Sequence, residues 1–148
     1  MKSVTLVSVL VILSVVAACG PSTPTATPTP QPTPTPVEEI ADQVDDLVGI
    51  WTFHEGRDYV EFLADGTMRV ADTLEELQKN TPWLTGTFWF EGTVFNEMDT
   101  WCEDKGTYEV RLVREGGETV ALRWKVIEDS CGDRRDAYRG RTLRLTNQ

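Results

Sequence analysis

The feature that most constrains this chain is an alternation of apolar and polar residues with a period of two, which runs from about residue 49 almost to the end. Turn-forming residues interrupt it about every 8–12 residues, a spacing typical of all-β sandwiches and barrels. Successive side chains of a strand point to opposite faces. The pattern therefore predicts an all-β domain in which each strand buries one face.

The alternation sets the register of one hairpin around the turn residues 64–66. A three-residue loop there pairs Phe62 with Met68 and Val60 with Val70, which places apolar residues opposite one another. A two-residue loop would shift the pairing by one residue and turn apolar side chains to the wrong face. We therefore predict the longer loop, with its glycine in the left-handed position.

A second hairpin is predicted around residues 115–117, which read Glu-Gly-Gly. A three-residue loop pairs Arg114 with Glu118, and the register then carries Tyr108 opposite Trp124. The residues between them alternate between apolar side chains on one face and charged side chains on the other, as expected for a strand pair with one solvated face.

The remaining elements complete about eight antiparallel strands joined by short turns. Closing such an up-and-down meander into a barrel removes its exposed edges. The expected elements are a short amphipathic N-terminal helix at 38–48, strands at 49–54 and 137–145, a helical turn at 73–79, and a hairpin of residues 83–90 and 93–98.

Residues 1–18 have the layout of a secretory signal peptide, with a basic start at Lys2 and an apolar run over residues 4–16. The run is shorter than the ~20 apolar residues of a transmembrane helix; an uncleaved anchor is the alternative. It ends in Ala17-Ala18-Cys19, which resembles the bacterial lipobox. The resemblance implies that Cys19 is lipidated and attaches the protein to a membrane of the bacterial cell envelope, where it faces the periplasm or the exterior.

Residues 19–37 form the predicted linker, and residues 38–148 the predicted folded domain. Proline and threonine alternate through most of the linker, and proline prevents both helices and strand ladders. Such a stretch favours an extended polyproline II spacer, which could hold the domain up to about 50 Å from the lipid. A proline-recognition ligand is the alternative.

The chain has 14 basic and 24 acidic residues and a net charge of −10, which argues against nucleic acid as a partner. With Cys19 assigned to lipid, Cys102 and Cys131 remain. An even pair in an oxidising compartment favours a disulfide, and here it would close the open end of the second hairpin. A metal pair is the alternative, but it lacks other ligands because His54 is the only histidine.

The segment 47–51, Leu-Val-Gly-Ile-Trp, resembles the G-x-W opening of lipocalins, with Gly49 and Trp51 matching. The resemblance implies a lipocalin-like up-and-down barrel over most of residues 47–148, with Trp51 closing one end. The second lipocalin motif, T-D-Y, has no counterpart here, so no specific ligand is implied.

The lipocalin resemblance also implies that an arginine of the last strand packs over Trp51, the candidates being Arg139, Arg141 and Arg144. The later part resembles lipocalin-like domains of exported bacterial proteins at Cys102, Gly106-Thr107-Tyr108, Trp124, Asp129-Ser130-Cys131 and Arg134.

An eight-stranded barrel is either filled by its own side chains or holds one small ligand. The predicted ligand contacts are six large aromatic residues: Trp51, Phe62, Phe88, Phe90, Tyr108 and Trp124. Acidic residues between 128 and 136 crowd around Arg134 and Arg135. Their spacing fits no calcium loop, and local caps and ion pairs at a strand end are the favoured interpretation.

The sequence therefore predicts a membrane-attached, non-enzymatic lipoprotein whose barrel binds a small apolar ligand, without cofactor or metal. No Ser-His-Asp arrangement can be built around His54, so no catalytic residues are predicted. The alternatives are a protein-binding envelope module that inhibits a lytic enzyme or protease, for which an acidic surface suits a basic target, and a purely structural envelope lipoprotein.

Overall fold

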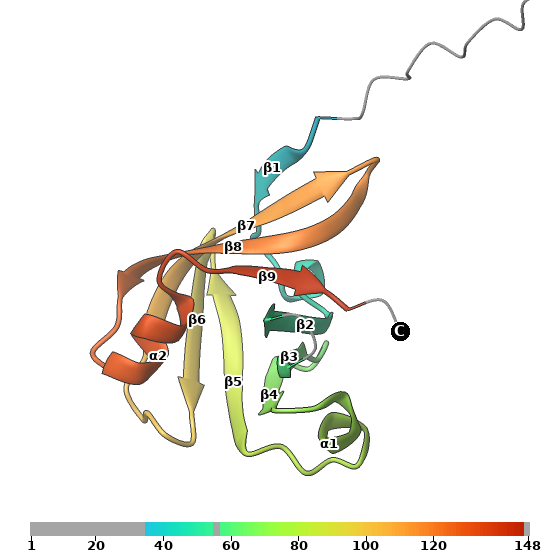
Figure 1. Ribbon diagram of the computed structural model, residues 1–148. Coiled ribbons are helices and arrows are strands. Elements are labelled where there is room, and N and C mark those ends of the chain that lie inside the picture. The colour runs from blue at the N-terminus through green and yellow to red at the C-terminus, as the bar shows by residue number, and fades with distance from the viewer. Residues whose placement is uncertain (1–34, 55–56, 147–148) are drawn as a thin grey trace, which may run out of the picture. The chain divides into compact units, whose positions relative to one another are not determined.

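The computed structural model describes residues 35–54 and 57–146. The predicted signal peptide, Cys19 and most of the linker lie outside this part of the chain. The described residues form nine strands, two α-helices and one 3-10 turn (Figure 1). In chain order these are β1 Val37–Ile40, the 3-10 turn Val44–Asp46, β2 Gly49–His54, β3 Arg57–Phe62, β4 Thr67–Ala71, α1 Leu74–Gln78, β5 Leu84–Glu91, β6 Val94–Asp99, β7 Gly106–Glu115, β8 Glu118–Glu128, α2 Gly132–Tyr138 and β9 Thr142–Leu145.

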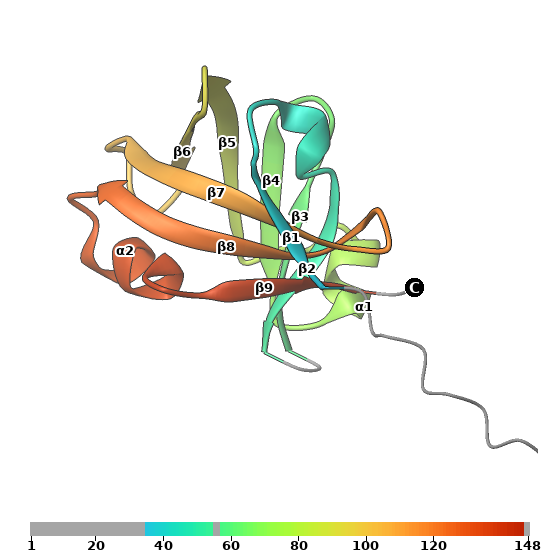
Figure 2. The same ribbon diagram turned by 90° about the horizontal axis from the view of Figure 1, so that it is seen from above.

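Strands β2 to β9 close into an antiparallel barrel of eight strands. Each strand pairs with the next along the chain, and β9 pairs back with β2 through Trp51–Leu145. The predicted up-and-down meander is therefore confirmed, and closure gives every barrel strand two neighbours. Strand β1 lies outside the ring, where it runs along the part of β7 that β6 does not cover (Figure 2).

The β3–β4 hairpin has the predicted register. Val60 pairs with Val70 and Phe62 pairs with Met68. Gly66 has a φ of 81°, a conformation that costs glycine little because it has no Cβ. The three-residue loop is therefore confirmed, and the pattern of apolar pairs was sufficient to choose it.

The β7–β8 hairpin differs from its predicted register by two residues. Glu115 pairs with Glu118 across a two-residue loop, and Val110 rather than Tyr108 lies opposite Trp124. Both loop glycines have positive φ, 61° and 94°, as a two-residue primed turn requires. A bulge follows the first two pairs. Because an even shift keeps each side chain on its own face, the predicted inner and outer faces are unchanged.

Of the helix predicted over residues 38–48, the structure retains only the 3-10 turn Val44–Asp46. The start of the segment is strand β1 instead. There Glu39 accepts a hydrogen bond at 2.9 Å from Arg114 of β7, in addition to the backbone ladder between the two strands. A helix of so few residues is marginal in water, so an uncovered strand edge decides the conformation.

The predicted last strand, residues 137–145, begins too early. Residues 132–138 form helix α2, and β9 is limited to Thr142–Leu145. Arg134 and Tyr138 lie four residues apart, on one helical face, and both are buried. The helix therefore brings one charged and one aromatic side chain to the end of the barrel.

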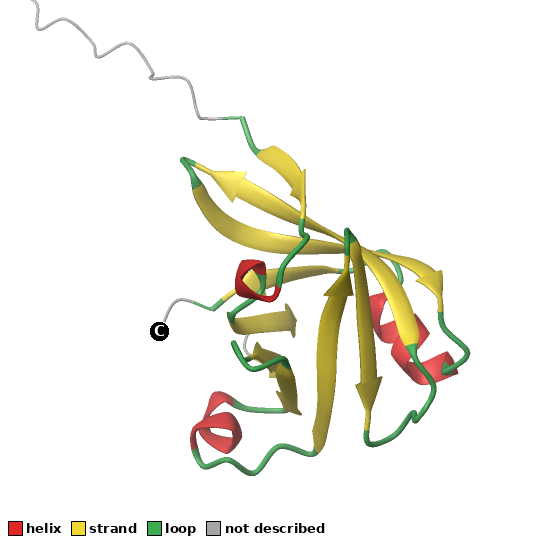
Figure 3. Ribbon diagram, turned by 180° about the vertical axis from the view of Figure 1, so that it is seen from behind, coloured by secondary structure: helices red, strands yellow, loops and turns green. Residues whose placement is uncertain are grey.

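Aromatic side chains fill much of the barrel interior. Phe62, Phe88, Phe95 and Trp124 are buried, and their ring centroids lie between 4.8 and 6.2 Å apart. Three of these ring pairs are edge-to-face and two are stacked, and both kinds of contact add to the hydrophobic gain. Helix α1 packs against β3 and β4, helix α2 packs against β8, and Figure 3 shows the two on opposite sides of the strands. Within the described ranges, no helix combines the length and apolarity needed to cross a bilayer.

Candidate ligand-binding site

A pocket of about 520 Å³ lies at the end of the barrel beside α2. Its volume is within the roughly 300–1,000 Å³ that small-molecule sites occupy. Strands β2, β4, β5 and β6 supply inward-facing side chains, and α2 closes the opposite wall. The apolar part of the lining consists mainly of Phe53, Met68, Val70, Leu84 and Tyr138.

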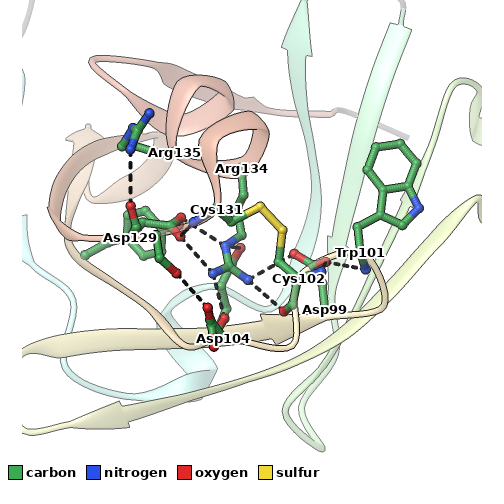
Figure 4. Close-up of a disulfide and its surroundings, with 11 residues drawn as sticks. Asp99, Trp101, Cys102, Asp104, Asp129, Cys131, Arg134 and Arg135 are labelled. Atoms are coloured by element: carbon green, nitrogen blue, oxygen red, sulfur yellow. Dashed lines mark hydrogen bonds and ion pairs between the residues drawn. A yellow bond between two sulfur atoms is a disulfide. The ribbon is translucent and has the colours of Figure 1, made fainter.

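The disulfide Cys102–Cys131 forms part of the pocket wall, with its Cα atoms 6.1 Å apart. It joins the β6–β7 connection to the start of α2 (Figure 4). This bond confirms the predicted pairing. It spans the open end of the β7–β8 hairpin. Closing a loop of this length contributes roughly 3–4 kcal/mol in the chain-entropy account. The disulfide therefore holds α2 against the barrel.

Beside the disulfide, Arg134 commits all five N–H donors of its guanidinium to the protein (Figure 4). Nε and Nη2 donate to the two carboxylate oxygens of Asp129 at 3.0 and 2.9 Å. Nη1 donates to Asp99 at 3.2 Å and to the Cys102 carbonyl at 3.4 Å. The second Nη2 proton reaches the Asp104 carbonyl at 2.8 Å. An arginine has five such donors, so none is left for another acceptor.

Asp129 and Asp99 also receive hydrogen bonds from other groups. Asp129 accepts the Tyr108 hydroxyl proton and the backbone N–H of Cys131, the latter at 2.8 Å. Asp99 accepts the backbone N–H of Trp101 at 2.7 Å. Both carboxylates therefore accept hydrogen bonds in their charged form. A buried charge requires such partners.

These contacts fix the charge of the Asp129–Arg134 pair. Burial alone would raise the pKa of Asp129, but the hydrogen bonds from Arg134 and Tyr108 outweigh it and lower that pKa. Burial would lower the pKa of Arg134, yet its hydrogen bonds to Asp129 raise it. The pair is therefore ionised across the physiological range of pH.

Glu97 is the member of this cluster whose carboxylate has no donor. It lies on β6, is fully buried and lines the pocket. Neither carboxylate oxygen has a hydrogen-bond partner of good geometry. Arg134 Nε is 3.5 Å from Oε1, but its proton goes to Asp129. Burial raises the pKa of Glu97 to about 8, against the opposing effects of Arg134 and of the nearby Tyr138 hydroxyl.

Two tryptophans form the outer rim of the pocket. Trp83 and Trp101 both line it, and their ring centroids are 4.7 Å apart. The two residues are 43% and 64% exposed, and Figure 4 shows the Trp101 indole directed away from Arg134. Large apolar groups exposed together on a surface are typical of binding sites.

The six aromatic residues predicted to contact ligand lie mostly in the barrel core, and their role as ligand contacts stays a prediction. None of the six lines the pocket. Tyr108 and Trp124 contact its wall through Tyr138, against which their rings pack with centroid distances of 5.1 and 4.4 Å. Five of the set are buried and the sixth is partly buried, these being Trp51, Phe62, Phe88, Tyr108 and Trp124, then Phe90.

Trp51 is held by a hydrogen bond from its Nε1 to the carbonyl of Leu47, at 2.8 Å. One of the arginines expected to pack over Trp51 is Arg144. It pairs with Thr52, while Leu145 pairs with Trp51. Because successive residues of a strand face opposite ways, the Arg144 side chain leaves β9 on the face away from Trp51.

Sequence reasoning missed Glu97 and the pocket around it. The signal was present in the β5–β6 hairpin, where Phe88 pairs with Glu97 and Phe90 pairs with Phe95. Alternation then places Glu97 on the same inner face as Phe95. The expected ion pairs around residues 128–136 are confirmed for Asp129–Arg134, but this pair is buried and part of the pocket cluster.

Comparisons with protein-family models, with curated proteins and with solved structures find no match to this chain. Within residues 35–54 and 57–146, no group of three or more His, Cys, Asp or Glu side chains is arranged to hold a metal ion. The pocket and its lining residues are therefore the features of this chain that bear on its function.

Proposed function

We propose that the protein is a non-enzymatic envelope lipoprotein whose barrel binds a small, mainly apolar ligand in the pocket beside α2. The observation that carries this proposal is the pocket itself, about 520 Å³ in volume and walled by Phe53, Met68, Leu84 and Tyr138. Mostly apolar walls with a few polar groups are typical of small-molecule sites.

The proposal places the barrel at a membrane surface through lipidated Cys19, with residues 19–37 as a spacer. Two or more acyl chains on one cysteine would give stable attachment, since each buried CH₂ contributes about 0.8 kcal/mol. Mass spectrometry of the mature N-terminus tests this part, and an unacylated terminus elsewhere in the chain would contradict it.

Ligand binding is tested with N-phenyl-1-naphthylamine, an uncharged apolar dye whose fluorescence rises in apolar surroundings. The full chain should give a saturable signal. Leu84→Trp fills the pocket with a larger side chain and should weaken binding by about tenfold or more, while adding at most a modest packing strain. Leu84 is buried in the pocket wall.

The matched control is Ile127→Trp, which makes a similar change at a residue 56% exposed on β8 and outside this pocket. It should bind the dye as the original chain does. Thermal unfolding verifies that both variants fold. Absence of saturable binding to the original chain, or equal binding by Leu84→Trp, would contradict the proposal.

A protein-binding role is the second candidate, favoured by the exposed Trp83–Trp101 pair at the rim. Exposed tryptophans are frequent anchors in protein interfaces, and the net charge of −10 suits a basic enzyme such as lysozyme. Sedimentation with lysozyme at low and high salt tests this role. Retention that is lost in the double variant Trp83→Ala/Trp101→Ala would support it over small-molecule binding.

A further inference from the structure

The starting observation is that neither carboxylate oxygen of Glu97 accepts a hydrogen bond of good geometry, although the Tyr138 hydroxyl lies nearby. Arg134, the one cation within contact distance at 3.5 Å among the described residues, has given all its protons to other acceptors. A buried acceptor without a partner destabilises the fold, and more so when it is charged. Such a group in a pocket wall marks a place where a ligand supplies the missing contact.

The charges point to the kind of donor that is missing. Within the described ranges, the buried charged side chains are Glu97, Asp99, Asp129 and Arg134, so three carboxyl groups share one guanidinium. Asp129 and Asp99 use that guanidinium with direct hydrogen bonds. The remaining carboxyl group, that of Glu97, lies 3.5 Å from the same guanidinium but accepts no hydrogen bond of good geometry from it, so it has no cation of its own.

We propose that the pocket selects a small apolar molecule that carries a protonated amine, with the ammonium group bound by the Glu97 carboxylate. This inference rests on the proposed function of the pocket. An ammonium supplies N–H donors and a positive charge together, as a buried carboxylate requires. An alcohol would supply only the donor, and a carboxylic acid would bring a further negative charge toward the cluster.

The rim of the pocket adds a second attraction for a cation. Trp83 and Trp101 line the pocket, are both exposed, and have ring centroids 4.7 Å apart. An indole face attracts an ammonium ion electrostatically. Tyr138 lines the inner wall. Aromatic side chains therefore line the pocket together with Glu97.

The geometry also couples binding to a proton. Glu97 is faced by Arg134 and Tyr138 of α2, Tyr108 of β7, Asp129 after β8 and Asp99 of its own strand. Burial raises the pKa of Glu97 to about 8, so the empty pocket keeps this carboxyl group protonated at neutral pH. An ammonium ion must displace that proton. Amine affinity should therefore rise about tenfold per pH unit between pH 6 and 8 and level off above pH 8.

Calorimetric titration of the full chain at pH 8 tests the inference with three matched probes: 2-phenylethylamine, 2-phenylethanol and 3-phenylpropanoate. The amine should bind about tenfold or more tightly than the alcohol, and the carboxylate should bind most weakly. In Glu97→Gln the amine should lose about tenfold or more in affinity, while the alcohol changes less than about threefold. Glu103→Gln, which removes one exposed carboxylate outside the pocket lining, should leave all three affinities unchanged.

The outcomes separate the inference from the proposed function. Equal or tighter binding of the alcohol, or an amine affinity unchanged by Glu97→Gln, would overturn amine selection and leave the pocket as a binding site. Failure of all three probes, together with the apolar dye, would overturn the binding function itself. If Glu97→Gln does not fold, titration of the original chain at pH 7 in buffers of different ionisation enthalpy decides: close to one proton released per amine supports the inference, and none released overturns it.

Discussion

Two regions of the barrel interior differ in the side chains that they bury. In the filled region Phe62, Phe88 and Phe95 pack ring against ring, and their side chains carry no polar atoms. In the region beside α2, Glu97 and Arg134 are buried next to a pocket of about 520 Å³. Both regions belong to the same closed sheet.

The comparison indicates how a small barrel can combine stability with binding. Packed aromatic groups supply hydrophobic free energy without directional demands, whereas the buried charges of Arg134, Asp99 and Asp129 depend on the hydrogen bonds between them. The disulfide joins the segments that carry this cluster, and the filled region has no such bond among the described residues. Substitutions in the charged region should therefore have the larger and more specific effects.

The largest expected effect is that of Arg134→Ala. It leaves Asp99 and Asp129 buried without their cation, and breaking a buried ion pair in this way typically costs about 3–5 kcal/mol. Urea unfolding measures the loss. Arg135→Ala, which removes the neighbouring and more exposed arginine, should cost under about 1 kcal/mol; equal costs for the two variants would show that the cluster is not a structural unit.

The double variant Cys102→Ser/Cys131→Ser should lose roughly 3–4 kcal/mol of unfolding free energy, because the unfolded chain regains the entropy of a loop closed across 29 positions. Since both cysteines line the pocket, dye binding should weaken as well. Unchanged affinity in a destabilised but folded variant would show that the disulfide serves the fold and not the pocket.

Glu97→Gln should change how stability depends on pH. In the folded chain the pKa of Glu97 is raised from 4.5 to about 8, so its contribution to stability is complete below about pH 4.5 and is lost as the pH rises through 8. The original chain should therefore lose stability relative to the variant by up to about 1.4 kcal/mol per pH unit in that interval. Urea unfolding from pH 5 to 9 measures this; a pH-independent difference would contradict the raised pKa.

The smallest effect on stability is expected at the rim. Trp101 is 64% exposed, so Trp101→Ala should change the unfolding free energy by under about 1 kcal/mol, yet weaken amine binding by roughly threefold to tenfold through loss of the cation–π contact. Trp89→Ala, at a partly buried residue that hydrogen-bonds Glu91 outside this pocket, is the control. Similar losses of amine affinity in both variants would show that the tryptophans at the rim do not contribute to binding.

The sequence predicted the closed barrel, the disulfide and the β3–β4 register because local patterns determine them. A register shift by one residue would break apolar pairs such as Val60–Val70 and turn the side chains of one strand to the wrong face. The β7–β8 register was wrong because a shift by two residues leaves the same faces apolar, and the alternation around Trp124 cannot distinguish the two pairings. Only the turn at the two glycines and the bulge decide between them.

The charged cluster was not predicted because its members come from separate parts of the chain. Glu97 lies on β6 and Arg134 on α2, and only the closed fold places them 3.5 Å apart. Residues 132–138 were assigned partly to the last strand, which hid the helical spacing of Arg134 and Tyr138. The six predicted aromatic contacts identified the filled region, whereas the pocket depends on residues that tertiary packing brings together.

The most direct test of the account is a crystal structure of the full chain with 2-(4-bromophenyl)ethylamine, in which anomalous scattering locates the bromine. The account predicts one bound molecule in the pocket, with its ammonium nitrogen about 3 Å from a Glu97 carboxylate oxygen and its ring against Met68 and Tyr138. A pocket that stays empty at saturating amine, or a bromine site elsewhere on the protein, would contradict it.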